Sequence, residues 1–436
     1  MKRRDLLRSG VGAVGAGLVS RSTGLASTST TGQFFGGARG APGRRFDAWI
    51  GVNVANLTAN LALVRDRAGG LPVMAVVKAD AYGHGVVPVA QTLAAAGVAA
   101  FMVTNTQEAV ALRDAEIATP ILHFGRVFGP AAELIVEHNL EQMIDSADAV
   151  SELVAGAAMQ RAEAVVHVHI DTGMGRVGVP WREAGELIRY VGGRSRVRIA
   201  GVSTVFTEDP DFDRVQLGRF NEICERAIAE GIDIGRRHAA SSAAVLAMPD
   251  AHLDMVRPGM LLYGHYPSRA ARDREPDLGL KPVLGLRARV VSVKSLRQGE
   301  SVGYHRVYVA ATPQTIALLP IGYSDGYPPE AVVGGGHVWI RGTRCPFVGE
   351  MNSNHCAVRI PERLDVQPGE VAVMIATGDE AAAFGADPGP AARDPSMGMP
   401  TAEMVADWGG ISDYRVHIQL SSELPRSLEG RGRRRF

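Results

Sequence analysis

A lysine stands where an apolar, strand-like run meets a glycine-rich turn. Residues 74–85 read Met-Ala-Val-Val-Lys-Ala-Asp-Ala-Tyr-Gly-His-Gly, so Lys78 directly follows the apolar run. Burying an unpaired ammonium group is costly, and the position makes sense if the amine forms an imine with an aldehyde. The plain alternative is a lysine whose charged end reaches water at the end of a strand. The run therefore predicts either Schiff-base chemistry at Lys78 or an ordinary solvated lysine.

Further motifs combine glycines with residues that bind anions or move protons. Residues 256–264 read Val-Arg-Pro-Gly-Met-Leu-Leu-Tyr-Gly, and residues 171–178 read Asp-Thr-Gly-Met-Gly-Arg-Val-Gly. Residues 299–305 read Gly-Glu-Ser-Val-Gly-Tyr-His, and residues 321–327 read Ile-Gly-Tyr-Ser-Asp-Gly-Tyr. Together with the lysine run, these motifs resemble those of the alanine racemase family, and the resemblance covers roughly residues 46–426.

The resemblance implies a racemase that uses pyridoxal 5'-phosphate (PLP) as its cofactor. It implies that Lys78 holds the cofactor and acts as the base on one face of the substrate. Tyr304 would act on the opposite face, so that the two residues carry out a two-base racemisation of alanine. In the family this tyrosine comes from the partner subunit, which implies a homodimer with shared active sites. A tyrosine ordinarily titrates near pH 10, so this role needs positive charge close by.

The remaining site residues are carried over in the same way, one position at a time. Arg257 would donate a hydrogen bond to the pyridine nitrogen without protonating the ring, since arginine keeps its proton, and His238 would support it. The residues expected around the cofactor phosphate are Tyr82, Ser242, Gly259, Met260 and Tyr414, the last from a looser match at 408–414. The residues expected near the substrate are Arg176, Tyr323, Ser353 and Asn354.

Three positions depart from the family's pattern. Val205 replaces a histidine that links the catalytic tyrosine to the ring arginine, so that chain is broken or completed by water. His169 replaces a lysine, often carbamylated, so Arg176 loses an anionic partner. Ser353 and Asn354 replace a methionine and an aspartate where the substrate is contacted. The smaller and neutral side chains predict room for longer amino acids than alanine.

The elements that must position these residues change in character along the chain. From about 46 to 284, short apolar runs alternate with longer helical stretches, a pattern that predicts an α/β fold with a parallel sheet. Its length suits an N-terminal (β/α)8 TIM-like barrel with chemistry at the carboxyl ends of the strands. Residues 285–426 carry mainly short β runs separated by turn signals and predict a mainly antiparallel β domain. Residues 427–436 are expected to form a basic tail.

The first 45 residues have a different composition. Arg3 and Arg4 precede a modest apolar stretch, which predicts a twin-arginine signal peptide over 1–26, followed by a disordered linker over 27–45. The protein is then expected in the periplasm, or in the cytoplasm if the signal is not used. The apolar stretch is too short to span a bilayer, so no membrane association of the mature form is expected.

Composition and spacing exclude several other classes. The chain has 436 residues with 46 Lys+Arg and 46 Asp+Glu, so no basic excess indicates nucleic acid. Its three cysteines lack metal-ligand spacing, and no metal site is expected. Two alternatives remain open at this point: a PLP decarboxylase of the same architecture, and a non-catalytic PLP-binding protein.

Overall fold

The computed structural model describes residues 46–383 and 398–430, and the predicted signal peptide and linker lie outside these ranges. Within the described part, no helix combines the length and the apolar character that crossing a membrane requires.

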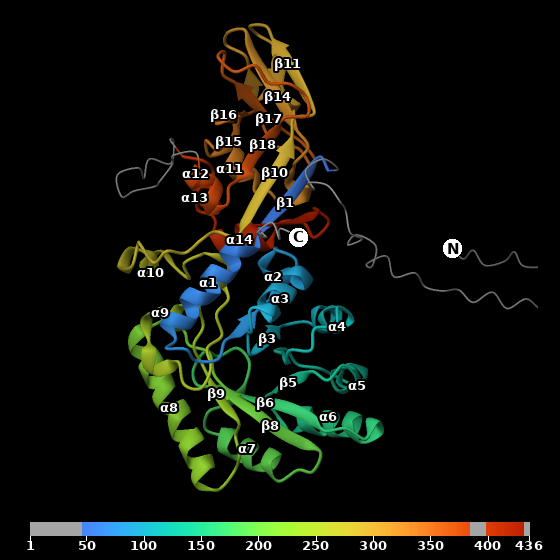
Figure 1. Cartoon of the computed structure of the whole chain (residues 1–436), viewed down its shortest axis with the longest axis vertical. Helices are drawn as coiled ribbons and strands as arrows, with labels where there is room; N and C mark the ends of the chain where they lie inside the picture. Colours follow the sequence, from blue (N-terminus) through green and yellow to red (C-terminus); the bar gives the residue numbers. More distant parts are fainter. Residues whose placement is uncertain (1–45, 384–397, 431–436) are drawn as a thin grey trace, which may run out of the picture. The chain divides into compact units, whose positions relative to one another are not determined.

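The N-terminal half forms a curved parallel sheet with helices outside it (Figure 1). Its strands follow one another in the order β2-β3-β4-β5-β6-β8-β9, and β7 pairs beside β6. These strands are β2 (Met74–Val76), β3 (Ala100–Val103), β4 (Ile121–His123), β5 (Glu141–Ile144), β6 (Ala164–Asp171), β7 (Val179–Pro180), β8 (Val197–Ser203) and β9 (Arg236–His238). Their apolar side chains are almost all buried, as expected for strands covered on both faces.

Residues 254–258 bridge the gap between the last and the first strand of this sheet. The amide of Asp254 donates to the carbonyl of Arg237 in β9 at 3.1 Å, and the amide of Met74 in β2 donates to the carbonyl of Val256 at 2.9 Å. The predicted TIM-like barrel is thereby confirmed. The closing segment also carries the Val-Arg-Pro-Gly motif, so that motif lies beside the strand that leads to Lys78.

Helices connect the strands and begin at polar caps. The side chains of Asn53, Asn105, Ser146 and Asp209 accept hydrogen bonds from the first amides of their helices. The helices are α1 (Val54–Arg67), α2 (Lys78–Tyr82), α3 (Val86–Ala95), α4 (Thr106–Asp114), α5 (Pro130–Glu137), α6 (Ala147–Gln160), α7 (Ala184–Gly192), α8 (Pro210–Ala229) and α9 (Ser242–Ala247).

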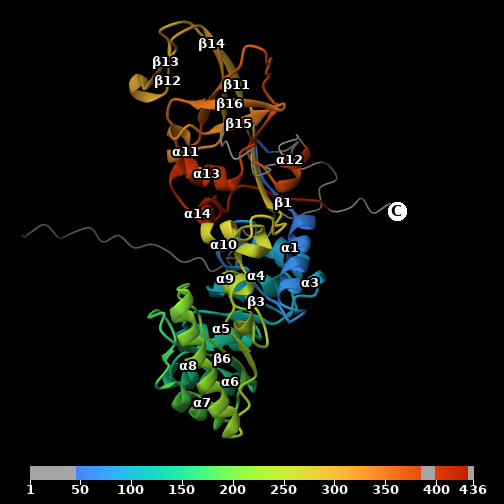
Figure 2. The same ribbon diagram turned by 90° about the vertical axis from the view of Figure 1, so that its left-hand side faces the viewer.

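The C-terminal half is built on a nine-stranded, mostly antiparallel sheet in the order β11-β14-β17-β16-β15-β18-β10-β1-β19. Its strands are β1 (Ala48–Asn53), β10 (Leu284–Arg289), β11 (Ser292–Leu296), β14 (Gln314–Leu319), β15 (His337–Ile340), β16 (Thr343–Val348), β17 (Cys356–Ile360), β18 (Val371–Ile375) and β19 (Arg426–Glu429). A hairpin of β12 (Ser301–Val302) and β13 (Tyr308–Val309) projects beside β14 (Figure 2). The helices of this half are α10 (Arg269–Arg274), α11 (Pro329–Val333), α12 (Gly378–Ala383), α13 (Ala402–Gly409) and α14 (Asp413–Ile418).

The predicted segment boundaries need two corrections. Strand β1, assigned from the sequence to the barrel, lies in the C-terminal sheet, where it pairs antiparallel with β10 and parallel with β19. Residues 427–429, assigned to a basic tail, belong to β19 and bury Ser427. Both errors have one cause, because the pairing joins residues nearly 400 positions apart and leaves no local pattern in the sequence.

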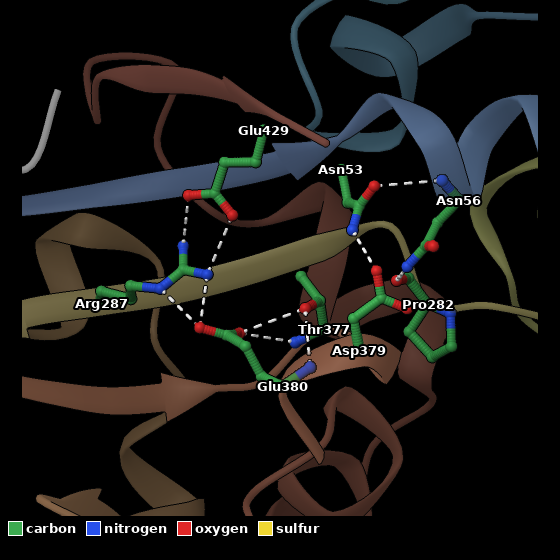
Figure 3. Close-up of polar contacts among 8 residues, drawn as sticks. All are labelled: Asn53, Asn56, Pro282, Arg287, Thr377, Asp379, Glu380 and Glu429. Carbon is green, nitrogen blue, oxygen red and sulfur yellow. Dashed lines mark hydrogen bonds and ion pairs between the residues drawn. The ribbon is translucent and has the colours of Figure 1, made fainter. Parts of the chain in front are cut away.

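A largely buried ion-pair network links β10 to α12 and β19 (Figure 3). Arg287 of β10 donates to Glu380 at 2.6 and 2.9 Å and to both carboxylate oxygens of Glu429 at 3.0 Å. Nearby, Asn53 donates to Asp379 at 2.8 Å while its side-chain oxygen caps α1. The Arg287 side chain is only 10% exposed, so its charge depends on these carboxylates.

Replacing Arg287 with alanine should destabilise the protein strongly. The change leaves Glu380 and Glu429 facing each other without their shared cation, and breaking a buried pair in this way costs about 3–5 kcal/mol. Thermal unfolding of the variant measures the loss. As a control, Arg198→Ala removes a pair with Glu163 whose two side chains are both 53% exposed, and it should change stability by less than about 1 kcal/mol. Equal shifts in the two variants would contradict the importance given to Arg287.

Candidate active site

Lys78 lies two residues after the end of β2, at the carboxyl end of the barrel strands, where it begins α2 and is only partly exposed. Burial lowers the pKa of its amine, the positive charge of Arg176 lowers it further, and the carboxylate of Glu108 partly opposes both. A lysine with a lowered pKa has more of its amine in the neutral, nucleophilic form near neutral pH. This environment favours the Schiff-base reading of Lys78 over that of a solvated lysine.

The four residues after Lys78 form a turn of left-handed helix. Ala79, Asp80, Ala81 and Tyr82 have φ angles between 53° and 55°, which for non-glycine residues costs roughly 1–2 kcal/mol each. Glu108 accepts a hydrogen bond from the Asp80 amide at 2.8 Å and so helps to hold the turn.

A second restraint on this turn comes from the far end of the chain. Arg426 donates to the carbonyl of Gly83 at 3.0 Å and lies 3.3 Å from the carboxylate of Asp80. Sequence reasoning missed both Glu108 and Arg426, because neither lies in a motif.

The turn delivers Tyr82 into a cluster of aromatic rings. Tyr82 is buried, and its ring lies 4.7 Å from that of Tyr263 and 5.2 Å from that of Tyr414. Its hydroxyl lies so close to Gly259 that a Cβ at position 259 would collide with it. Glycine is therefore required at 259 because of this close approach.

Ser242 completes a small cradle around Gly259. The Ser242 hydroxyl accepts hydrogen bonds from the amides of Gly259 at 3.0 Å and Leu261 at 3.3 Å. The hydroxyl groups of Tyr82 and Ser242 thus both lie beside Gly259. Met260 follows in the same segment and begins the short helix η3 (Met260–Tyr263).

Arg257 is buried and makes no ion pair in the described part of the chain. Burial lowers the pKa of its guanidinium to about 10, which leaves it charged at neutral pH. Its donors reach the carbonyl of Thr204 at 2.7 Å, the carbonyl of Ala239 at 3.2 Å, and both the carbonyl and the ring of His238. The structure therefore places His238 in contact with Arg257.

A chain of hydrogen bonds runs from Arg257 through two histidines to a carboxylate. Arg257 can only donate, so Nδ1 of His238 accepts at 2.7 Å, and Nε2 of His238 donates to Nδ1 of His167 at 2.8 Å. Nε2 of His167 then donates to Glu141 at 2.8 Å. Burial, together with the charge of Arg257, lowers the pKa of His238 and keeps it neutral. Sequence reasoning missed His167 and Glu141, which face His238 only through strand pairing.

Two of the three departures noted in the sequence, His169 and Val205, lie in the barrel half of the chain. His169 is buried against Ser203, and burial lowers its pKa to about 3, so it supplies no charge to Arg176. Val205 is partly buried and has no polar side-chain atom to offer Arg257, whose donor goes instead to the preceding carbonyl of Thr204. Arg176 is exposed near Lys78.

The other predicted residues lie on the C-terminal domain, away from Lys78. Tyr304 is 72% exposed next to the β12–β13 hairpin, and Tyr323 is 55% exposed in the short helix η5 (Tyr323–Asp325). Ser353 and Asn354 are also exposed, and Asn354 donates to Ser324 at 2.9 Å, beside Tyr323. One chain therefore brings Lys78, Arg257 and the cradle together, whereas its Tyr304 and Tyr323 are exposed on the C-terminal domain.

The influence of Arg176 on Lys78 can be measured. Replacing Arg176 with glutamine removes a positive charge and should raise the pKa of the Lys78 amine. The reaction of that amine with an aldehyde should then need higher pH, which a pH series of reaction rates measures. Arg182→Gln, which removes an arginine stacked on Trp181, is the control and should leave the profile in place. Equal profiles for wild type and Arg176→Gln would contradict this assignment.

Comparison with known proteins agrees with this geometry. The family profile described as alanine racemase, N-terminal domain, matches residues 52–267, and that described as alanine racemase, C-terminal domain, matches residues 283–428. A protein named alanine racemase from Carboxydothermus hydrogenoformans is 35% identical over 388 residues, which cover 87% of this chain and 98% of the relative.

Solved structures give the same result. An alanine racemase structure from Clostridium difficile 630 superposes with a TM-score of 0.79 at 28% identity, covering 88% of this chain and 96% of that one. An alanine racemase structure from Streptomyces coelicolor A3(2) superposes with a TM-score of 0.76 at 31% identity, covering 88% of this chain and 98% of that one. The chain therefore belongs to the alanine racemase family.

Proposed function

We propose that this protein is a PLP-dependent amino-acid racemase that interconverts L- and D-alanine. One observation carries the proposal: the amide of Val76 donates to the carbonyl of Pro258 at 3.0 Å. This bond places Lys78 and the Arg257–Gly259 segment side by side at one end of the barrel. A reactive amine, a charged donor and an anion cradle are the groups that a phosphorylated pyridine aldehyde needs.

The residues present fit the cofactor. Lys78 would tether its aldehyde carbon, Arg257 would donate to its ring nitrogen, and the cradle of Tyr82, Ser242 and Gly259 would take its phosphate. The close approach of the Tyr82 hydroxyl to Gly259, which leaves no space for a side chain at 259, brings the groups of the cradle together and supports this fit. When bound, the cofactor supplies an electron sink for the bond to hydrogen at the substrate α-carbon.

The residues of the chain select which proton moves and from which face. The Lys78 Nζ, whose pKa is lowered by burial and by Arg176, accepts or returns a proton on one face. The Tyr304 hydroxyl of the partner subunit does so on the other face. Arg257 would donate to the ring nitrogen of the cofactor and keep its own proton. The ring would then withdraw electrons less strongly, which favours racemisation over side reactions.

A chiral assay tests the activity and its breadth. Purified, PLP-loaded protein is given L-Ala, L-Ser, L-Met, L-Lys or L-Arg separately, and the D-product is measured. D-Ala supports the proposed racemase, and D-product from several substrates supports relaxed specificity. No D-product from any substrate would refute the proposed function.

We attribute relaxed specificity to Ser353 and Asn354. Asn354 is neutral, and its bond to Ser324 ties this loop to the segment that bears Tyr323. Replacing Ser353 with methionine should fill space in this region and lower kcat/KM for longer substrates more than for alanine. Kinetics on alanine and methionine measure the ratio, and Glu362→Met on a distant exposed turn is the control. An unchanged ratio would remove Ser353 from this role.

We further propose that the protein acts in the periplasm after twin-arginine export. The paired residues Arg3 and Arg4 before a modest apolar stretch support this proposal. Cell fractionation should find the protein in the periplasm, and changing both arginines to lysine should retain it in the cytoplasm. Equal distribution of the two proteins would contradict the proposal.

A further inference from the structure

Three buried histidines lie together behind the phosphate cradle. His84 follows α2, His265 follows η3, and His417 lies in α14. Their rings lie in a row: those of His84 and His417 are stacked with centroids 5.5 Å apart, and that of His265 is tilted against His417 with centroids 4.2 Å apart. All three side chains are almost fully buried.

Most of the ring nitrogens in this row have no protein partner. In residues 46–383 and 398–430, neither nitrogen of His265, neither nitrogen of His417 and not Nε2 of His84 makes a hydrogen bond. Buried polar atoms are nearly always paired, because leaving one unpaired forfeits its hydration. A group of unpaired buried nitrogens therefore indicates a missing ligand.

Two carboxylates face His265 from the C-terminal domain. Glu403 of α13 and Asp413 of α14 each bring an oxygen to within 4.8 Å of a His265 nitrogen and of each other. Nδ1 of His265 lies 3.9 Å from Oδ2 of Asp413, too far for a hydrogen bond. Glu403 also accepts from Arg272 at 2.7 Å, which leaves its second oxygen for another partner.

The carboxylates are reachable from solvent. A cavity of about 280 Å³ is lined by Glu403 and Asp413, together with Arg272 and Asp407. The cavity gives an ion access to the two carboxylates and gives water room to complete its coordination.

We propose that His265, Glu403 and Asp413 bind a divalent transition-metal ion of the Zn²⁺ class. An imidazole nitrogen with two carboxylate oxygens suits Zn²⁺ and its first-row neighbours, whereas Mg²⁺ and Ca²⁺ prefer oxygen ligands alone. Binding at about 2.0–2.2 Å draws the three side chains together. Sequence spacing predicted no metal because His265 precedes Glu403 and Asp413 by more than a hundred residues and meets them only in the fold.

The ion would tie the barrel to the C-terminal helices. His265 belongs to the segment that follows the Val-Arg-Pro-Gly motif, while Glu403 and Asp413 belong to α13 and α14, which lie near one another in Figure 2. Asp413 directly precedes Tyr414, whose ring contacts Tyr82 in the cradle. The bound ion is therefore expected to stabilise the fold and to fix the position of Tyr414.

Metal titration of the full-length, PLP-loaded protein tests the site. After chelator treatment and removal of the chelator, Zn²⁺ should bind at one ion per chain in calorimetry. It should also raise Tm by about 3 °C or more at a hundredfold excess over Kd. Mg²⁺ at the same concentration should not shift Tm. Absence of saturable Zn²⁺ binding would overturn the proposal.

Three variants distinguish metal binding by His265 and Glu403 from a role in packing alone. His265→Leu should abolish the Zn²⁺-dependent rise in Tm, yet without metal it should be at least as stable as wild type, because it removes two unpaired nitrogens. Glu403→Gln, at a partly exposed position, should weaken binding at least tenfold. Asp407→Asn, which lines the same cavity but pairs with Arg269, is the matched control and should bind Zn²⁺ normally.

Two outcomes would overturn the assignment. If Glu403→Gln binds Zn²⁺ as tightly as wild type, the ion binds elsewhere, for example on the cofactor phosphate. If His265→Leu folds but is less stable without metal and keeps the Zn²⁺ response, His265 is a packing residue. Neither readout depends on racemase activity, so the metal site and the proposed function can fail separately.

Discussion

Replacing Lys78 with alanine should lower racemase activity by about 10⁴-fold or more. The change removes both the group expected to tether the cofactor and the base on one face of the substrate, two contributions that multiply. Lys78 follows β2 beside the segment of Arg257 and Gly259, and in the described structure no other lysine is placed at this cradle. The D-alanine formed by the purified variant, and the cofactor absorbance that it retains after dialysis, measure the two losses.

A control variant and the restraints on the turn after Lys78 make the test of Lys78→Ala specific. Lys281→Ala changes a lysine on the connection between the domains and should keep both activity and bound cofactor. The strained turn after Lys78 is held by Glu108 and Arg426, which do not depend on the Lys78 side chain. The variant should therefore fold, with a Tm near that of wild type. Activity within tenfold of wild type in Lys78→Ala would refute the assignment.

The sequence predicts the core of this site because its chemistry is local. Lys78 and Tyr82 lie within five residues of each other, and Arg257, Gly259 and Met260 lie in one short segment. Each such segment carries its own glycines, and the structure explains one of them directly, since a side chain at 259 would meet the Tyr82 hydroxyl. The alternation of strands and helices that leads to these segments is a local pattern as well.

What the sequence does not predict depends on contacts between distant residues. The path from Arg257 to Glu141 crosses three strands through His238 and His167, and only strand pairing brings these side chains within 2.8 Å. The placement of β1 in the C-terminal sheet likewise depends on β10 and β19. The apolar stretch across β10 and β11 likewise forms two strands, because the chain changes pairing partner there, from β1 and β18 to β14.

Replacing Tyr304 with phenylalanine should lower racemisation by roughly 10²–10⁴-fold while the cofactor stays bound. The change removes only the hydroxyl, and Tyr304 is 72% exposed, so it contributes no buried contact to its own chain. Folding and PLP content should match those of wild type. Tyr308→Phe, in the same hairpin, is the control and should keep its activity. Unchanged racemisation by Tyr304→Phe would refute its catalytic role.

Mixing the two inactive variants decides whether Tyr304 works in its own subunit or in the partner. In a two-fold symmetric dimer that shares its sites, a hybrid of Lys78→Ala and Tyr304→Phe subunits has one site with both residues intact and one with neither. Random exchange should then restore about a quarter of wild-type activity, since half of the dimers are hybrids with one working site each. If both residues act within one chain, every site lacks one of them and mixing restores nothing. The exposure of Tyr304, together with the partly buried position of Lys78 at the barrel, favours restoration.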